Sequence, residues 1–127
     1  MALVDTDVMV EAQRARPGAA AWLAELRGDV ALPAAVAWEL LIGSRDSAEL
    51  ERARRFLAGF SVVEIQEEDS ARARELIGEH CLSSGPGLPD YLIAAQALTR
   101  QATLYTFNVR HYQAIPGLNA RVPYARG

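Results

Sequence analysis

Short apolar runs alternate with helix-like stretches along most of this chain, and this alternation limits the fold more than any other feature. Strands and helices that follow one another in this way form a parallel sheet with helices on both faces. The expected strands are residues 2–4, 30–32, 61–65 and 103–106, with a small edge strand at Val122. The sequence therefore predicts an α/β fold with three layers (α/β/α) and a mostly parallel central sheet of four to five strands.

The segments between these runs carry apolar faces and end at helix breakers. Pro33 is expected in the first turn of a helix, where its missing N–H costs nothing. Asp69 is expected to cap the N-terminus of another helix. The expected helices are residues 7–15, 19–27, 33–43, 47–58, 69–80, 89–101 and 108–114.

Whole-chain properties exclude several classes of protein. The length of 127 residues suits one domain that spans residues 1–127. A net charge of −3 excludes strong non-specific attraction to nucleic acid, so any such binding needs local basic patches or a metal. No apolar run is long enough to cross a membrane, and the N-terminus lacks the basic region of a signal peptide. We therefore expect a cytoplasmic protein with no membrane partner.

Polar side chains follow the expected strands at the points where sites form in parallel sheets. Asp5 ends the first strand, and Asn108 lies just past the strand that ends near Thr106. Glu39 and Asp90 lie early on helices that follow a strand or a loop. Sites in such sheets lie outside the carboxyl ends of the strands. We therefore expect Asp5, Glu39, Asp90 and Asn108 to converge at one edge.

The apolar surroundings of three of these acids suggest a metal. A buried carboxylate needs a partner, but the chain has no lysine and no arginine lies beside these acids in sequence. A hard cation, Mg²⁺ with Mn²⁺ as the alternative, would neutralise Asp5, Glu39 and Asp90 together. Structural alternatives stay open: Asp5 could cap a helix, Glu39 could face solvent, and Asp90 could stabilise a helix N-terminus. Asp7 fits a cap and a supporting site role equally well.

Other residues with catalytic potential have simpler interpretations. The arginines at 52, 54 and 55 are expected to pair with Glu49 and Glu51 on a solvated helix face. His111 is expected to be a surface or packing residue. No nucleophile lies in an elbow-like sequence, and the glycines near residue 86 lack a phosphate-loop lysine.

Four stretches together resemble the motifs of PIN domains. They are LVDTDV at 3–8, AWELLIG at 37–43, LPDYLIAA at 88–95 and TFNVRHY at 106–112. The last of these, together with IPGL at 115–118, is similar to the closing motif of VapC-type toxins. The resemblance covers nearly the whole chain and implies a PIN-like fold. It also implies a ribonuclease toxin of a type II toxin–antitoxin pair, a metal-dependent endonuclease that cuts single-stranded or loop RNA and forms a homodimer. Its other partner would be a small antitoxin protein that blocks the site.

The expected mechanism follows from this resemblance and from metal chemistry. Asp5 and Asp90 would hold Mg²⁺, Glu39 and Asn108 would position water, and Thr106 would hydrogen-bond a site carboxylate or a water. Many PIN domains carry an acid where this chain has Asn108, although the Thr-x-Asn form is common among these toxins. An amide adds no negative charge, so a second metal would be held more weakly.

Three other functions remain open at this stage. A haloacid-dehalogenase-type phosphatase would match the Asp5-Thr6-Asp7 start, but its chemistry needs a lysine that the chain lacks. A degenerate PIN domain that only binds protein is suggested by Asn108. A PIN nuclease outside toxin–antitoxin systems is the third. For the toxin, we expect the antitoxin to deliver an Arg or Lys to the Asp5–Asp90 pocket, since cations pair strongly with carboxylates.

Overall fold

A five-stranded sheet forms the centre of the computed structural model, which describes residues 1–26, 28–83 and 85–126. The strand order is β3-β2-β1-β4-β5, and every neighbouring pair is parallel. The strands are β1 (Ala2–Val4), β2 (Val30–Pro33), β3 (Ser61–Val63), β4 (Thr103–Tyr105) and β5 (Asn119–Arg121). The predicted parallel α/β sheet is confirmed, although the edge strand ends one residue before Val122.

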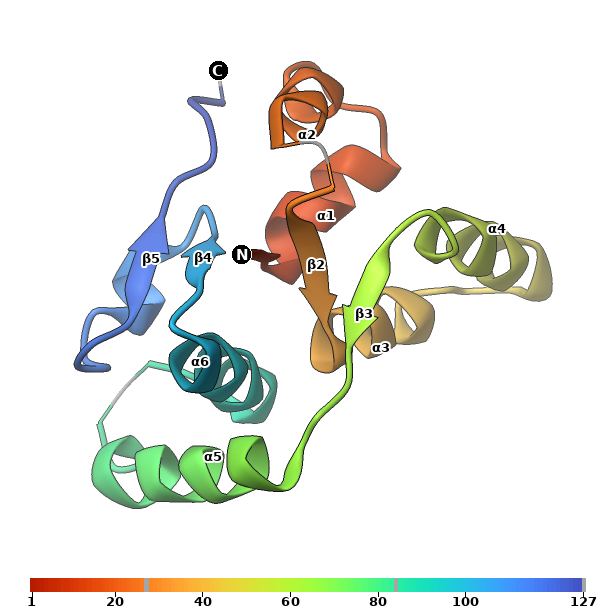
Figure 1. Cartoon of the computed structure of the whole chain (residues 1–127). Helices are drawn as coiled ribbons and strands as arrows, with labels where there is room; N and C mark the ends of the chain where they lie inside the picture. The colour runs from red at the N-terminus through yellow and green to blue at the C-terminus, as the bar shows by residue number, and fades with distance from the viewer. Residues whose placement is uncertain (27, 84, 127) are drawn as a thin grey trace.

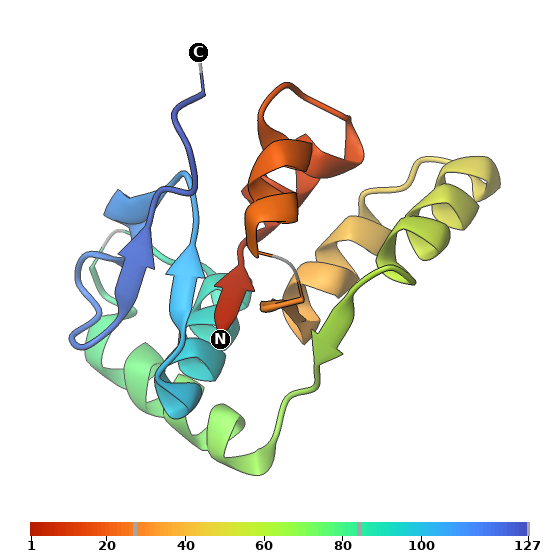
Figure 2. The ribbon, with the colours of Figure 1, turned by 45° about the horizontal axis from the view of Figure 1, so that its top comes forward.

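Helices cover both faces of this sheet (Figure 1). They are α1 (Thr6–Gln13), α2 (Ala19–Leu26), α3 (Ala34–Ile42), α4 (Ser47–Leu57), α5 (Glu67–His80) and α6 (Leu88–Arg100), with a 3₁₀ helix, η1 (Val109–Tyr112). The stacked pair α5 and α6 lies on one side of the strands, and α1 with α2 lies on the other. Figure 2 shows α3 and α4 extending past the β3 edge.

The predicted helices agree with these bounds to within a few residues. Pro33 was predicted in the first turn of a helix, but it ends β2 and is the N-cap of α3, one position before that turn. The predicted helix 108–114 is the shorter η1. The predicted last residue of the second helix, Arg27, lies outside the described residues. No helix in the described part of the chain is both long and apolar enough to cross a membrane.

Strand β1 lies at the centre of the sheet because its residues tolerate burial on both faces. Leu3 and Val4 are fully buried, as expected for a parallel strand that reads as an unbroken apolar run. Small residues of α6 such as Ala94 and Ala95 are also fully buried and let that helix approach closely. The central strand therefore ends in the middle of the sheet edge, where Asp5 follows it.

The register between β1 and β4 sets the position of the polar residues that follow them. Val4 pairs with Tyr105, and the backbone N–H of Asp5 donates to the Tyr105 carbonyl at 2.9 Å. Thr106, the residue that follows β4, donates its backbone N–H to the Arg121 carbonyl at 2.9 Å. Asp5 and Thr106 are therefore neighbours at the carboxyl edge of the sheet.

The prediction that Asp69 is the N-cap of a helix is wrong. Gln66 is the N-cap of α5, and Asp69 is the third residue of the helix, fully buried. Its two carboxylate oxygens accept from the Arg100 guanidinium at 2.8 and 2.9 Å, and Thr99 also donates to it. Burial alone would raise the pKa of Asp69, but the hydrogen bonds from Arg100 and Thr99 and the charge of Arg100 lower it. Breaking such a pair costs about 3–5 kcal/mol, so it fixes α5 against α6.

Candidate active site

Asp5 lies where β1 turns into α1, and it is buried with 7% of its surface exposed. Its Oδ1 accepts from the Thr6 backbone N–H at 2.8 Å, so Asp5 caps α1 as the structural alternative expected. Its Oδ2 accepts from the Thr106 hydroxyl and from the Tyr112 hydroxyl, both at 2.9 Å. The same carboxylate therefore caps a helix and joins a polar cluster at the carboxyl edge.

Asp90 reaches this cluster from α6. As the third residue of that helix, it accepts from the Gly87 backbone N–H at 3.0 Å through Oδ2, which is a capping contact. Its Oδ1 accepts from the Tyr112 hydroxyl at 3.2 Å. Asp5 and Asp90 therefore meet around one hydroxyl group, although they lie far apart in sequence.

Asp7 is the third acid of this edge. Its Oδ2 accepts from the Phe107 backbone N–H at 3.1 Å and lies 3.5 Å from the Thr106 hydroxyl. Its Oδ1 is buried and has no hydrogen-bond partner among the described residues. Burial, and then the nearby charge of Asp5, raise the pKa of Asp7 to about 6.

The electrostatics of Asp5 show the same shortage of positive charge. Burial is the main cause that raises the pKa of Asp5, and the negative charge of Asp90 raises it further. The hydrogen bonds from Thr6, Thr106 and Tyr112 lower it but do not compensate. Among the described residues, the groups that donate hydrogen bonds to Asp5 are thus neutral, although the acid is desolvated.

Glu39 joins the cluster indirectly. It is half-buried on α3, and its Oε1 accepts from the Thr6 hydroxyl at 2.6 Å. Thr6 therefore links Glu39 to Asp5, since its backbone N–H donates to Asp5. Among the described residues, Glu39 has no direct hydrogen bond to Asp5 or Asp90, so the structure brings it beside those acids through one intervening residue.

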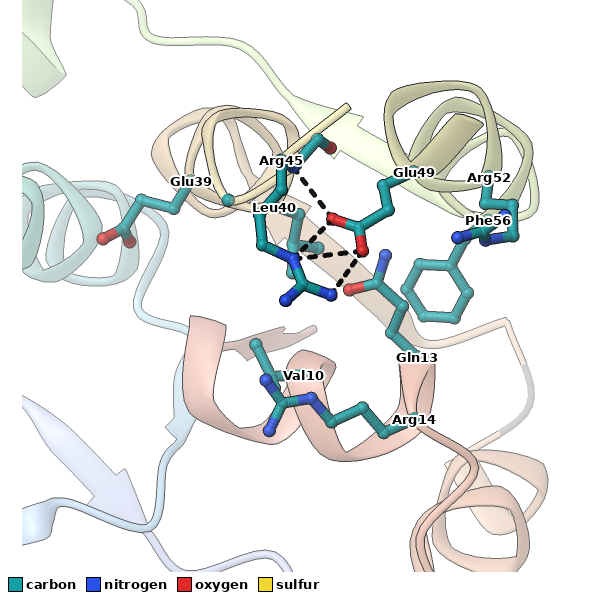
Figure 3. Close-up of a pocket in the computed structure, with 11 residues that line it drawn as sticks. Val10, Gln13, Arg14, Glu39, Leu40, Arg45, Glu49, Arg52 and Phe56 are labelled. Atoms are coloured by element: carbon teal, nitrogen blue, oxygen red, sulfur yellow. Dashed lines mark hydrogen bonds and ion pairs between the residues drawn. The ribbon is translucent and has the colours of Figure 1, made fainter. Parts of the chain in front are cut away.

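A pocket of about 600 Å³ opens next to Glu39, between α1, α3 and α4 (Figure 3). Its lining residues are Val10, Gln13, Arg14, Glu39, Leu40, Gly43, Ser44, Arg45, Glu49, Arg52 and Phe56. In Figure 3 the Glu39 carboxylate lies at one end of the pocket, and Arg52 lies at the other. The pocket therefore joins a site carboxylate to a lining that carries three arginines.

The arginines of this pocket differ in their partners. Arg45 pairs with Glu49, with an Nη2–Oε2 distance of 2.7 Å. Arg14 and Arg52 have no ion pair within the described residues. The predicted pairing of Arg54 with Glu51 is present at 3.7 Å, but Glu49 pairs with Arg45 and not with the predicted arginines. Two guanidinium groups are thus available to an anion in the pocket.

Asn108 lies at the rim and is exposed. Its backbone N–H donates to the Thr106 hydroxyl at 3.0 Å, while its side-chain amide donates to Nδ1 of His111. The Asn108 amide is therefore engaged with His111 in this structure and makes no hydrogen bond to the site acids among the described residues.

Sequence reasoning missed two residues of this edge. His111, expected as a surface or packing residue, donates from Nε2 to the Gly85 carbonyl at 2.7 Å and lies 3.9 Å from Oδ2 of Asp90. Tyr112 contacts both Asp5 and Asp90. The available signal was spacing, because residues three and four positions after Asn108 return to the same side of a helical turn.

The oxygen donors of this edge fit a hard cation. Asp5 and Asp90 face a common point, and the raised pKa of Asp5 reflects a desolvated acid beside a second one. In the described ranges, no three His, Cys, Asp or Glu side chains lie close enough to form a complete metal site. Mg²⁺ commonly uses one or two carboxylates and completes its shell with water and substrate phosphate. Asp5 and Asp90 are thus suitable ligands for such an ion.

The chain is similar to known proteins over most of its length. The sequence profile of the PIN domain matches residues 2–115. Ribonuclease VapC19 of Mycobacterium tuberculosis is 39% identical over 123 residues, covering 93% of this chain and 97% of that protein. Ribonuclease VapC10 of the same organism is 37% identical over 114 residues, covering 88% and 86%.

Solved structures extend the comparison to the fold. A chain of a toxin–antitoxin complex from Klebsiella pneumoniae superposes with a TM-score of 0.80 at 25% identity and covers 99% of this chain and 100% of that one. A chain of VapBC2 from Rickettsia felis, bound to a promoter DNA fragment, has a TM-score of 0.82 at 23% identity, with coverages of 95% and 97%.

The raised pKa of Asp7 predicts how stability depends on pH. The folded protein holds a proton on Asp7 that the unfolded chain releases near its ordinary pKa. The free energy of unfolding should therefore fall as pH rises between about 4 and 6. Asp7→Asn should reduce this fall, because an amide does not titrate yet can still accept from Phe107. Urea unfolding across this pH range, with a chelator present, measures the effect.

A matched control for Asp7→Asn is Glu25→Gln, on the exposed side of α2. This control should keep the pH dependence of the wild type. A pH dependence in Asp7→Asn equal to that of the wild type would show that Asp7 is not the group responsible.

Proposed function

Because the chain belongs to the PIN domain family, we propose that it is a metal-dependent endoribonuclease and the toxin of a type II toxin–antitoxin pair. The observation that carries the proposal is the meeting of Asp5 and Asp90 around one point at the carboxyl edge of the sheet. The ribonucleases VapC19 and VapC10, which match most of this chain, support RNA as the substrate. The absence of lysine disfavours a phosphatase of the haloacid dehalogenase type.

The proposed chemistry is hydrolysis of a phosphodiester bond by water. A bound Mg²⁺, or Mn²⁺ in its place, would supply a water of lowered pKa and stabilise negative charge on the scissile phosphate. Asp5 and Asp90 would hold the cation. Thr106 and the Thr6 backbone hold the Asp5 carboxylate in a fixed orientation through hydrogen bonds.

Glu39 and Asn108 would act on water. The Thr6 hydroxyl orients the Glu39 carboxylate at 2.6 Å, which leaves its second oxygen free to accept from the attacking water. Asn108 is exposed at the rim and would orient a further water once its amide leaves His111. Asp7 would stay a supporting residue, because its contacts are to Phe107 and Thr106.

The pocket beside Glu39 gives RNA a route to the acids. RNA binding depends on neutralising phosphates, and the net charge of −3 means that this attraction must be local. Arg14, the residue after α1, and Arg52 of α4 line the pocket (Figure 3). We assign them the phosphates that flank the cleavage site.

The catalytic role of Asp90 is tested by Asp90→Asn. The amide keeps an oxygen that can accept the Gly87 N–H, so the helix cap is retained, but the charge is lost. RNA cleavage should fall by about 100-fold or more, since loss of even an outer partner of a metal ligand costs 10–100-fold. Mg²⁺ binding should weaken, while the melting temperature without metal should stay unchanged or rise because repulsion between the acids falls.

The control for Asp90→Asn is Asp46→Asn. Asp46 caps α4 by accepting from the Glu49 N–H at 2.8 Å, so it is also a capping acid. The control should cleave RNA at the wild-type rate. An Asp90→Asn variant that melts at a lower temperature but cleaves RNA at the wild-type rate would contradict the catalytic role of Asp90. If Asp90 only stabilised the helix N-terminus, its loss would lower the free energy of unfolding by about 0.3–1 kcal/mol.

The role of Arg52 is tested in the inactive Asp90→Asn background, where RNA stays intact. Arg52→Gln should weaken binding of single-stranded RNA and lower the slope of log affinity against log salt by about 0.7, the value for one phosphate contact. Arg54→Gln is the matched control on the same helix, because Arg54 pairs with Glu51. Equal effects of the two variants would indicate a general charge effect and no pocket contact.

The proposed partner is a cognate antitoxin, in agreement with the toxin–antitoxin complex to which the fold is similar. A desolvated pair of acids attracts a cationic side chain, and Arg fits a carboxylate with two parallel hydrogen bonds. We propose that an antitoxin segment delivers an Arg or Lys between Asp5 and Asp90 and keeps RNA out. A homodimer and a cytoplasmic location complete the proposal.

Coexpression with the antitoxin tests this mode of inhibition. The purified complex should lack ribonuclease activity, and Ala in place of the delivered Arg or Lys should restore cleavage at protein concentrations where the complex stays assembled. Size-exclusion chromatography checks assembly. Full activity in the complex of unchanged partners would contradict inhibition through the acids.

A further inference from the structure

The hydroxyl of Tyr112 occupies an unusual position for a tyrosine. The side chain is buried, with 2% exposed, and its one hydroxyl lies 2.9 Å from Oδ2 of Asp5 and 3.2 Å from Oδ1 of Asp90. A phenol has a single proton to donate. That proton is therefore shared between two carboxylates that otherwise repel each other.

The oxygen that Tyr112 contacts on Asp5 has no free acceptor position. A carboxylate oxygen offers about two lone-pair sites, and on Oδ2 these serve the Thr106 and Tyr112 hydroxyls. Oδ1 accepts from the Thr6 N–H and keeps a second lone-pair site, but it is not the oxygen that Tyr112 joins to Asp90. A cation that bridges Oδ2 of Asp5 and Oδ1 of Asp90 would therefore need the position that the Tyr112 hydroxyl holds.

Tyr112 stays a neutral donor in these surroundings. Burial, followed by the charges of Asp5 and Asp90, raises the pKa of Tyr112 far above its ordinary value. Its helical turn is also held in place: His111 donates to the Gly85 carbonyl, and the Ile115 N–H donates to the Tyr112 carbonyl at 3.1 Å. The hydroxyl is thus a fixed group that carries no charge.

We propose that the Tyr112 hydroxyl is a placeholder for the cation. In the metal-free protein it links Asp5 to Asp90 and reduces their repulsion, and the cation displaces it from Asp5 when the site is loaded. This inference rests on the proposed metal site. It makes Tyr112 a positioning residue that stabilises the empty site at the expense of metal affinity.

The Thr106 hydroxyl serves as a comparison for the Tyr112 hydroxyl, because it only orients Asp5. Its hydroxyl donates to the same Asp5 oxygen, but its other contacts are Asp7 and the Asn108 N–H, and it does not contact Asp90. Thr106 therefore orients Asp5 without occupying the space between the two acids. Loss of the Thr106 hydroxyl should weaken metal binding, whereas loss of the Tyr112 hydroxyl should strengthen it.

The decisive variant is Tyr112→Phe, which removes one oxygen and keeps the ring. Calorimetric titration with Mg²⁺ and with Mn²⁺ should show affinity on the order of tenfold higher than in the wild type, the size expected for one lost competing charged hydrogen bond. In a chelator, the variant should melt at a lower temperature than the wild type. Added metal should then raise its melting temperature by more than it raises that of the wild type.

Tyr91→Phe is the matched control. Tyr91 is also buried, on α6, and its hydroxyl has no hydrogen-bond partner within the described residues. This variant should bind both metals with wild-type affinity. Equal gains in both variants would mean that removal of any buried hydroxyl has this effect, which would overturn the inference.

A spectroscopic readout keeps the test independent of the variant's folding. Metal added to the wild type should change the ultraviolet difference spectrum of tyrosine, because the Tyr112 hydroxyl loses its acceptor on Asp5. Unchanged or lower metal affinity in Tyr112→Phe, or metal binding with no tyrosine signal in the wild type, would overturn the placeholder and leave the metal site intact. Absence of metal binding by the wild type would overturn both proposals.

Discussion

The buried charge of Asp5 is the constraint on which the rest of the carboxyl edge depends. Parallel pairing of β1 with β4 brings this carboxylate to the centre of the sheet edge, away from water and beside a second acid. No basic side chain of the described residues hydrogen-bonds to it; its donors are a backbone N–H and the hydroxyls of Thr106 and Tyr112. Neutral donors stabilise such a charge only in part. The fold therefore maintains an unfavourable electrostatic interaction that a bound cation would relieve.

Helix capping and a role in the proposed site are compatible in this architecture. Asp5 caps α1, and Asp90 accepts from the backbone before α6, yet both also face the common point of the site. The reason is geometric, because helices that follow parallel strands begin at the carboxyl edge, where sites form. An acid that caps such a helix already lies near the site. A capping role at this edge is thus no argument against a catalytic one.

The sequence predicted the sheet and the acids, because both depend on local pattern. Apolar runs marked the strands, and acids in apolar surroundings marked the edge. Local pattern does not show contacts between distant segments. Asp69 was predicted to cap a helix, because its actual partner, Arg100, lies 31 residues away in sequence. The contact of Tyr112 with Asp5 spans 107 residues. Spacing from Asn108 indicates which side of the turn Tyr112 faces, but its partners depend on how the 3₁₀ turn packs against the sheet.

The buried link between Asp69 and Arg100 has a consequence for genetics. Arg100 and Asp90 stand ten residues apart on α6, about 15 Å along a rigid helix. A change on α5 that frees the far end of α6 would therefore tilt the end that carries Asp90. In a selection against the activity proposed for this protein, escape mutations should gather on α5 as well as at the acids. A map of such mutations would thus include residues that hold the site in position from outside it.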